Sequence, residues 1–298
     1  MSAQASAGSL TRLALGTAQF GLQYGVANRS GQVSVAEVGQ ILARAAAANV
    51  DTLDTAIAYG TSESCLGAAG VASWRVISKL PPLPGEVDDV RAWCEGQVRG
   101  SLSRLGIGRL EGLLLHRPAD LLGPRMLEYR AALDALQAAG LVGVVGVSIY
   151  DPAELDALWP VFRPGIVQAP CNVLDRRLIR SGWLARLADR GVRVHVRSVF
   201  LQGLLLMPAT RRPAAFARWR EVLDAWDEWC SQHSTSPLSA AIAFLNAQPG
   251  IERYVIGVDS LMQLEEVLAA AGASSEVPPQ GLFCDDRELI EPARWKLT

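Results

Sequence analysis

The chain has 298 residues, 50% of them hydrophobic and 19% charged, which is enough to bury one large core or two smaller ones. Its formal net charge of −2 argues against nucleic acid as a partner, because no basic face is expected to offset phosphate charge. No apolar run approaches the ~18 residues of a membrane span, residues 1–8 lack a secretion signal, and the five scattered cysteines form no CxxC pair. We therefore expect a cytoplasmic protein with no membrane partner, disulfide framework or metal site. The oligomeric state is open.

Short apolar, β-branched runs alternate with longer Ala-, Leu-, Arg- and Glu-rich segments, which is typical of repeated βα units around a parallel sheet. In the first half we expect strands at 13–16, 50–54, 75–80, 110–116 and 142–148. A Gly-rich loop is expected through residue 25. Helices are expected at 35–48, 62–67, 88–105 and 125–139, the first capped by Ser34 and the last ended by Gly140.

The second half repeats the scheme. Strands are expected at 166–169, 193–199 and 253–257, and helices at 151–159, 178–190, 213–233, 237–247 and 261–271, followed by an irregular tail at 274–298 near the barrel mouth. Eight strands, each followed by helix, without a linker, predict a single (β/α)8 TIM barrel over residues 1–298. A doubly wound open sheet is the main competitor.

Polar residues follow the apolar runs, where a barrel places its active site: Asp54, Lys79, His116, Ser148, Gln168 and Arg197. A buried lysine needs a counter-charge, and Asp54 is the candidate partner for Lys79. Lowering the pKa of the Tyr59 phenol from its free value near 10 to about neutral pH would take about 4 kcal/mol. One cation at about 4 Å supplies roughly that much at an effective dielectric of 20. Tyr59 could then act as a general acid towards a carbonyl oxygen that His116 also contacts.

Taken singly, each of these residues has a structural explanation as a turn, loop or surface residue. Asp54, Tyr59, Lys79 and His116 occur together at the ends of three successive strands, and this combination favours an active site.

Several stretches together carry a family resemblance: Leu15-Gly-Thr-Ala-Gln-Phe-Gly21, Leu53-Asp-Thr-Ala-Ile-Ala-Tyr-Gly-Thr-Ser-Glu63 with Leu66-Gly67, Ser78-Lys79, Leu115-His116, Gly146-Val-Ser148 and Val167-Gln168. These stretches follow one another in the same order as in the aldo-keto reductases, which the chain resembles from about residue 12 to 271. The resemblance implies a (β/α)8 barrel that binds a nicotinamide cofactor, NADP(H) in most members, across its C-terminal mouth without a Rossmann domain.

The resemblance also implies roles for single residues. Tyr59 would be the proton donor, tuned by Lys79 and Asp54, and His116 would orient the carbonyl. The residues implied for the cofactor are Gly16, Thr17, Ser148 and Gln168 at the nicotinamide half, Arg197, Ser198 and Gly203 in and after the seventh strand, and Gly257, Ser260, Gln263 and Glu266 at the pyrophosphate and adenosine end.

Four departures from the family pattern concern the cofactor. Ile149 replaces an asparagine that often contacts the carboxamide, and Val267 replaces another at the adenine end. Arg197 stands where a tyrosine often stacks on the nicotinamide, a role that a guanidinium can also fill. The segment 257–263 has no Lys or Arg, and Asp259 adds a negative charge. A bound 2′-phosphate usually needs a cation, so NAD(H) is the alternative cofactor.

The activity implied is reversible NAD(P)H-dependent reduction of an aldehyde or ketone, with a sugar or small aldehyde as the suggested substrate. Two other classes stay open. One is a non-catalytic nicotinamide-binding regulatory barrel, like the subunits associated with some ion channels. The other is a lyase that forms a Schiff base on Lys79.

Overall fold

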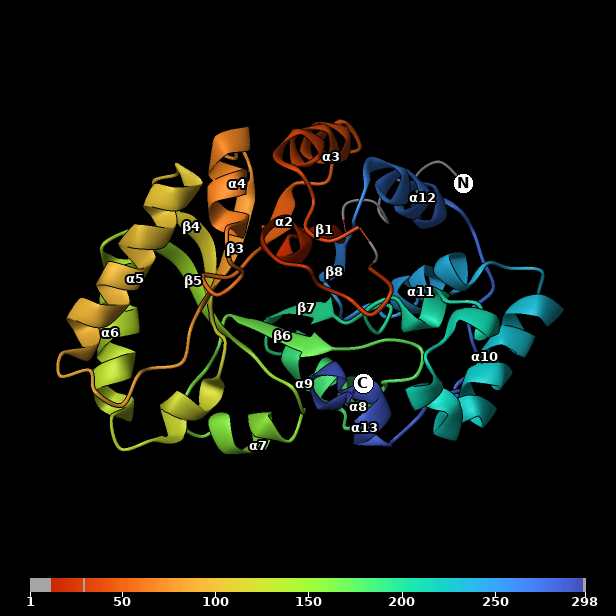
Figure 1. Cartoon of the computed structure of the whole chain (residues 1–298). Helices are drawn as coiled ribbons and strands as arrows, with labels where there is room; N and C mark the ends of the chain where they lie inside the picture. The colour runs from red at the N-terminus through yellow and green to blue at the C-terminus, as the bar shows by residue number, and fades with distance from the viewer. Residues whose placement is uncertain (1–11, 29, 297–298) are drawn as a thin grey trace.

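The computed structural model describes residues 12–28 and 30–296, so the predicted lack of a secretion signal at residues 1–8 falls outside the described part. Eight strands form a closed barrel in which each strand runs parallel to its neighbours and β8 pairs with β1 (Figure 1). The strands are β1 (Leu13–Gly16), β2 (Thr52–Asp54), β3 (Arg75–Leu80), β4 (Leu110–Leu115), β5 (Val142–Ser148), β6 (Ile166–Pro170), β7 (Arg193–Arg197) and β8 (Arg253–Gly257). The predicted (β/α)8 barrel is confirmed and the open sheet is excluded.

Helices surround the strands on the outside (Figure 1). They are α2 (Ala18–Gly21), α3 (Val35–Ala47), α4 (Ser62–Ala69), α5 (Val90–Leu105), α6 (Met126–Ala138), α7 (Glu154–Leu158), α8 (Arg177–Arg180), α9 (Trp183–Ala188), α10 (Arg220–Gln232), α11 (Pro237–Asn246), α12 (Leu261–Gly272) and α13 (Arg287–Ile290). Short 3-10 turns are η1 (Pro118–Leu122), η2 (Leu204–Leu206), η3 (Ala209–Arg211), η4 (Ala214–Trp219) and η5 (Pro292–Arg294). Ser34 caps α3 as predicted, because its side chain accepts a hydrogen bond from the Glu37 amide. Within the described residues, no helix is long and apolar enough to cross a membrane.

Some predicted elements are wrong in their extent. The helix predicted at 178–190 is two helices, α8 and α9, because Gly182 between them has a left-handed φ of 77°. The strand predicted to reach residue 199 stops at Arg197, since Ser198 has a φ of 58°, which no strand residue adopts. The helix predicted at 213–233 starts as the 3-10 turn η4, and the Gly-rich loop after β1 contains the one-turn helix α2.

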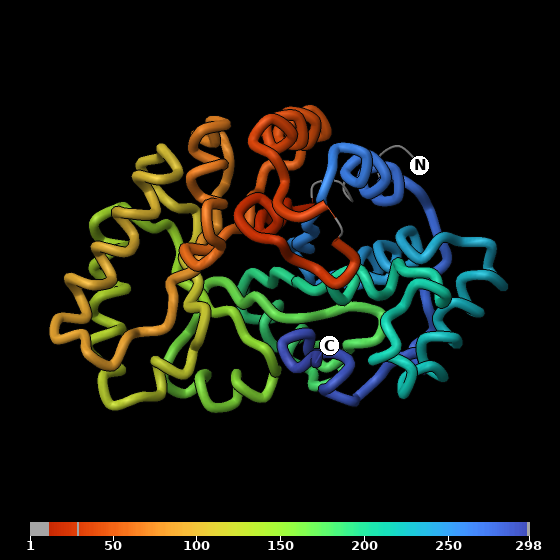
Figure 2. Tube along the Cα trace, viewed as in Figure 1, coloured from red at the N-terminus to blue at the C-terminus, as the bar shows by residue number. Residues whose placement is uncertain are grey.

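The tail predicted to be irregular contains α13 and η5 and packs on the barrel; its last two residues lie outside the described part. Leu289 and Ile290 are fully buried, and the Cys284 amide donates to the carbonyl oxygen of Leu174, beyond β6. Figure 2 shows this segment in dark blue beside the green α8 region. The tail therefore covers the chain that follows β6, at the end of the barrel where the strands finish.

The two ends of the barrel interior differ in chemistry. Around its middle the interior is filled by the apolar side chains of Ile77, Leu114 and Ile166. At the N-terminal ends of the strands, ion pairs link strands both around and across the barrel. Arg75 on β3 contacts Glu111 on the neighbouring β4 at 2.8 Å, and Arg193 on β7 contacts the same Glu111 across the barrel at 2.8 Å and Glu252, just before β8, at 2.9 Å. In the described residues, the interior is thus filled below its C-terminal end, which is where a barrel of this kind places its ligand site.

Candidate active site

Asp54 and Lys79 form a buried ion pair at the C-terminal ends of β2 and β3. Lys79 Nζ donates to Asp54 Oδ1 at 2.5 Å and to the Thr55 carbonyl oxygen at 2.9 Å. The second carboxylate oxygen of Asp54 accepts from the side-chain amide of Gln168 at 2.6 Å. Burial by itself would lower the pKa of Lys79, but the charge of Asp54 together with Tyr59 and the hydrogen bonds to both groups outweighs it and holds this pKa above its usual value. Lys79 is therefore a fixed cation.

Tyr59 lies beside this pair, on the loop between β2 and α4. Lys79 Nζ is 5.0 Å from the centroid of the Tyr59 ring. The loop owes its position to two glycines that pack together. A Cβ at Gly21 would stand 1.9 Å from the Tyr59 carbonyl oxygen, and one at Gly60 would stand 2.4 Å from the Gly21 carbonyl oxygen. Gly60 also has a left-handed φ of 54°. Both glycines belong to the stretches that carry the family resemblance, and their contact brings those stretches together.

His116 completes the cluster from the end of β4. Its ring meets that of Tyr59 edge to face, with 6.1 Å between the ring centroids. Burial, followed by the positive charges of Lys79 and Arg197, lowers the pKa of His116 to about 4. The imidazole is therefore neutral at pH 7, and a neutral imidazole can donate one hydrogen bond to a carbonyl oxygen. Asp54, Tyr59, Lys79 and His116 thus meet at one end of a cavity, as the sequence predicts for the ends of successive parallel strands.

The cavity has a volume of about 720 Å³, within the range of small-molecule sites. Of the residues predicted to bind cofactor, it is lined by Gly16, Thr17, Ser148, Gln168, Arg197, Ser198, Gly203, Gly257, Gln263 and Glu266. Ser260 does not line it, because its hydroxyl caps α12 by accepting from the Gln263 amide. Ile149, which replaces a family asparagine, is fully buried and also lies outside the lining. The cofactor roles of the lining residues stay predictions.

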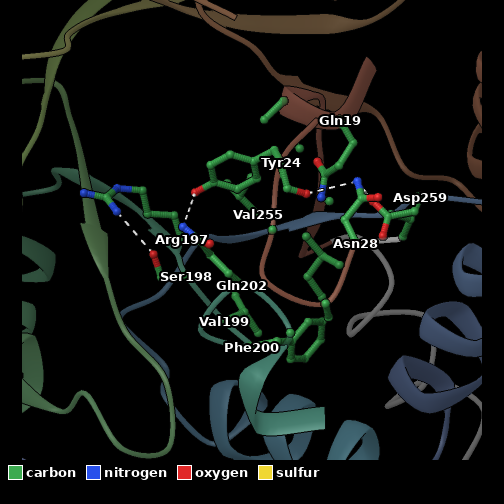
Figure 3. A pocket seen from close by; sticks show the side chains of 18 of the residues that line it. Gln19, Tyr24, Asn28, Arg197, Ser198, Val199, Phe200, Gln202, Val255 and Asp259 are labelled. Carbon is green, nitrogen blue, oxygen red and sulfur yellow. Dashed lines mark hydrogen bonds between the residues drawn. The ribbon is translucent and has the colours of Figure 1, made fainter. Parts of the chain in front are cut away.

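Two segments that line the cavity, one after β1 and one after β7, contact each other through Tyr24 and Gln202 (Figure 3). The Ala27 amide donates to the Gln202 carbonyl oxygen at 3.4 Å, and the Gln202 side chain contacts the Tyr24 hydroxyl at the same distance. A Cβ at Gly203 would stand 2.5 Å from that of Ala27. Sequence reasoning did not identify Tyr24, Ala27 or Gln202 as cavity residues. The Gly-rich composition after β1 was the only signal, and it indicated a loop without a contact.

Arg197 and Asp259 lie at opposite ends of the cavity (Figure 3). Arg197 stacks on Tyr150, with 4.5 Å between the guanidinium carbon and the ring centroid, and donates to the Ile149 carbonyl oxygen at 3.0 Å. Asp259 accepts from the side chain of Asn28 at 3.2 Å. Neither Asp259 nor Glu266, which also lines the cavity, forms an ion pair with any described residue.

The glycines of the cavity wall test whether an extended cofactor fits. Gly16 and Gly257 are register partners on β1 and β8, and both line the cavity. The space that the absent side chain leaves beside Gly257 is filled by the end of the flexible Gln19 side chain, whose Oε1 would stand 2.4 Å from a Cβ there. The Ser148 hydroxyl has only a long contact of 3.5 Å with the Gln168 side-chain oxygen, which leaves both groups hydrogen-bonding capacity for an amide. These features fit a nicotinamide cofactor.

Glu63 is part of the most specific stretch of the resemblance, yet it faces away from the cavity. It is 2% exposed and accepts hydrogen bonds from Ser78 at 2.8 Å and Ser101 at 2.6 Å, and it pairs with Arg104 at 2.7 Å. Glu63 thus ties α4 to β3 and α5, which holds the helix that follows the Tyr59 loop in place.

Known proteins share this architecture. The chain matches the model of the Aldo/keto reductase family over residues 12–276. Among solved structures it is similar to the putative aldo-keto reductase PA4992 from Pseudomonas aeruginosa, with 24% identity, a TM-score of 0.64 and coverage of 88% of this chain and 89% of the other. It is also similar to the holo form of the aldo-keto reductase AKR11C1 from Bacillus halodurans, with 17% identity, a TM-score of 0.72 and coverage of 96% and 93%. A search of curated protein sequences finds no match. Because the family model spans nearly the whole barrel, the chain belongs to the aldo/keto reductase family.

Proposed function

We propose that the protein is an oxidoreductase that interconverts an aldehyde or ketone and its alcohol, with a nicotinamide cofactor and with Tyr59 as the acid. The observation that carries the proposal is the cluster of Tyr59, the Asp54–Lys79 pair and neutral His116 at one end of a cavity large enough for cofactor and substrate. The bound cofactor would supply or accept the hydride, and the residues of the chain would handle the proton.

Each member of the cluster has a distinct part in moving that proton. Lys79 places a fixed positive charge 5.0 Å from the centroid of the Tyr59 ring, beside the phenol that is proposed to deliver the proton. Asp54 keeps Lys79 protonated and in place. His116 donates a hydrogen bond to the same carbonyl oxygen and so sets its distance from the Tyr59 hydroxyl. Ser148 and Gln168 are proposed to hold the carboxamide of the cofactor.

The protonated state of Lys79 counts against the lyase alternative. A Schiff base forms only from a neutral amine, whereas Asp54 raises the pKa of Lys79. A stable adduct of a carbonyl compound on Lys79, trapped by borohydride, would reverse this assignment.

The experiment is to replace Tyr59 by Phe and measure turnover with a panel of sugars and small aldehydes, using NADPH and NADH in parallel. We expect a loss of about 10²–10⁴-fold in kcat, the usual contribution of a general acid, with cofactor affinity changed by no more than a few fold. Tyr129→Phe is the matched control, since Tyr129 is a buried tyrosine of α6 outside the cavity. Retention of most of the activity by Tyr59→Phe would refute the role of Tyr59. Saturable cofactor binding without turnover of any carbonyl compound by the wild type would favour the regulatory barrel.

The choice between NADP(H) and NAD(H) depends on the far end of the cavity. The resemblance favours NADP(H), whereas the carboxylates of Asp259 and Glu266, without a paired cation, favour NAD(H), because a 2′-phosphate beside them would be repelled. The ratio of the NADH and NADPH affinities, measured by tryptophan fluorescence, decides between them.

A further inference from the structure

Arg197 carries a charge that none of the described residues neutralises. Its guanidinium donates to the Ile149 carbonyl oxygen and, at 3.2 Å, to the Ser198 hydroxyl, which are both uncharged. It forms no ion pair with any described residue, and two of its five N–H groups are accounted for by these bonds. One face of the guanidinium is covered by Tyr150. Arg197 lines the cavity, so its remaining N–H donors and its positive charge are available to a ligand there.

The other charges at this end of the cavity cancel. Lys79 and Asp54 form a neutral pair at 2.5 Å, and His116 is uncharged at pH 7. The field of Arg197 reaches the reacting groups, since it contributes to lowering the pKa of His116. Among the groups that line this end of the cavity, the net positive charge therefore comes from Arg197, and Arg117, outside the lining, adds a smaller positive field.

We propose that Arg197 makes this site bind the reduced form of the nicotinamide cofactor more tightly than the oxidised form, and so biases the bound equilibrium towards oxidation of an alcohol. The inference rests on the proposed function, which places the nicotinamide ring at this end. The oxidised ring carries a positive charge and the reduced ring is neutral, so a fixed cation nearby disfavours only the oxidised form.

The favoured direction is balanced without any further reactant. The C–H bond of the alcohol would break, and its hydride, with both electrons, would go to the oxidised ring. The O–H proton would pass to Tyr59 as the phenol releases its own proton to solvent, so the products would be a carbonyl compound, the reduced cofactor and one proton. The alcohol is oxidised by two electrons and the cofactor is reduced by two.

The size of the effect follows from Coulomb's law. Two unit charges about 6 Å apart at an effective dielectric of about 40 repel by an amount equivalent to roughly a tenfold change in affinity. A neutral aromatic residue at this position would produce no such difference. The pyrophosphate and riboses are the same in the oxidised and reduced cofactor, so their contacts affect both affinities equally and cancel in the ratio.

The test is to titrate the wild type, Arg197→Met and Arg197→Lys with NADH and NAD⁺, and with NADPH and NADP⁺, by calorimetry. We expect the ratio of reduced to oxidised affinity to be about tenfold higher in the wild type than in Arg197→Met. Arg197→Lys, which keeps the charge, should retain most of that ratio. Arg197→Gln, a second uncharged variant, should lose it and keeps the test decisive if Arg197→Met folds poorly.

An unchanged ratio in Arg197→Met would overturn the inference. An equal weakening of both forms would overturn it too, and would assign Arg197 to the cofactor's phosphates. If the wild type binds none of the four compounds, the proposed function itself fails, which is a different result from binding with an unchanged ratio.

Discussion

Removing one member of the Asp54–Lys79 pair should cost far more stability than removing both. The two side chains are only 5% and 1% exposed, so each singly substituted protein keeps a buried charge that has lost its counter-charge. In the Lys79→Met variant, the Asp54 carboxylate retains only its hydrogen bond from the Gln168 side-chain amide. In the Asp54→Asn variant, the Lys79 ammonium retains its hydrogen bond to the Thr55 carbonyl oxygen but has no carboxylate beside it. Breaking a buried pair in this way typically costs about 3–5 kcal/mol, which is a large part of the ~5–15 kcal/mol that stabilises a folded protein.

The double variant Lys79→Met/Asp54→Asn should recover much of this loss, because no uncompensated charge remains. The assay is urea denaturation of the four proteins followed by tryptophan fluorescence. Because each single variant should lose about 3–5 kcal/mol and the double variant less than either, the cycle should give a coupling energy of at least about 3 kcal/mol. The exposed pair of Arg44 and Glu265 serves as the control, and its cycle should show no resolvable coupling. If the two single variants each lose less than about 1 kcal/mol and their effects add, the pair is not a buried charge pair of the kind described.

Three further predictions concern stability. Gly146→Ala should destabilise the barrel by about 1–3 kcal/mol or more in thermal or urea unfolding, because its Cβ would lie 2.2 Å from the Ile166 carbonyl oxygen. Gly39→Ala is the control, because Gly39 lies on helix α3 with open space around it, and this substitution should stabilise the protein by about 0.5–1 kcal/mol. If Gly146→Ala and Gly39→Ala changed the stability equally, the packing around Gly146 would not be close. Glu63→Ala should cost at least about 2 kcal/mol in urea unfolding, since it leaves buried Ser78 and Ser101 without their shared acceptor; a loss within error would mean that this network does not secure α4. Burial lowers the pKa of His195 to about 4, whereas the unfolded chain protonates this ring near pH 6.5, so stability should fall by up to about 3 kcal/mol as pH drops from 6.5 to 4. Urea midpoints across that range should show a smaller slope in His195→Leu, and an identical slope would contradict the assignment.

The fold was predictable because its signals are local and repeated. Eight apolar runs at regular spacing, each followed by a helical pattern, define the βα units, and closure places the ends of all strands at one rim. The element boundaries were less predictable. The division of the 178–190 helix depends on the left-handed backbone of Gly182, and the early end of β7 on that of Ser198. A composition pattern does not encode a single residue's φ.

The sequence by itself determined which side chains reach the rim: Asp54, Lys79 and His116 end their strands, and a parallel barrel gathers strand ends. Only the tertiary structure decided what each group touches there. Gln168 bonds to Asp54 across 114 positions of the chain, and Arg197 turns towards the end of β5 without meeting a carboxylate. The physical reason is that the strand period fixes which face and which end a residue occupies, whereas hydrogen bonds and uncompensated charges depend on the packing of segments far apart in sequence.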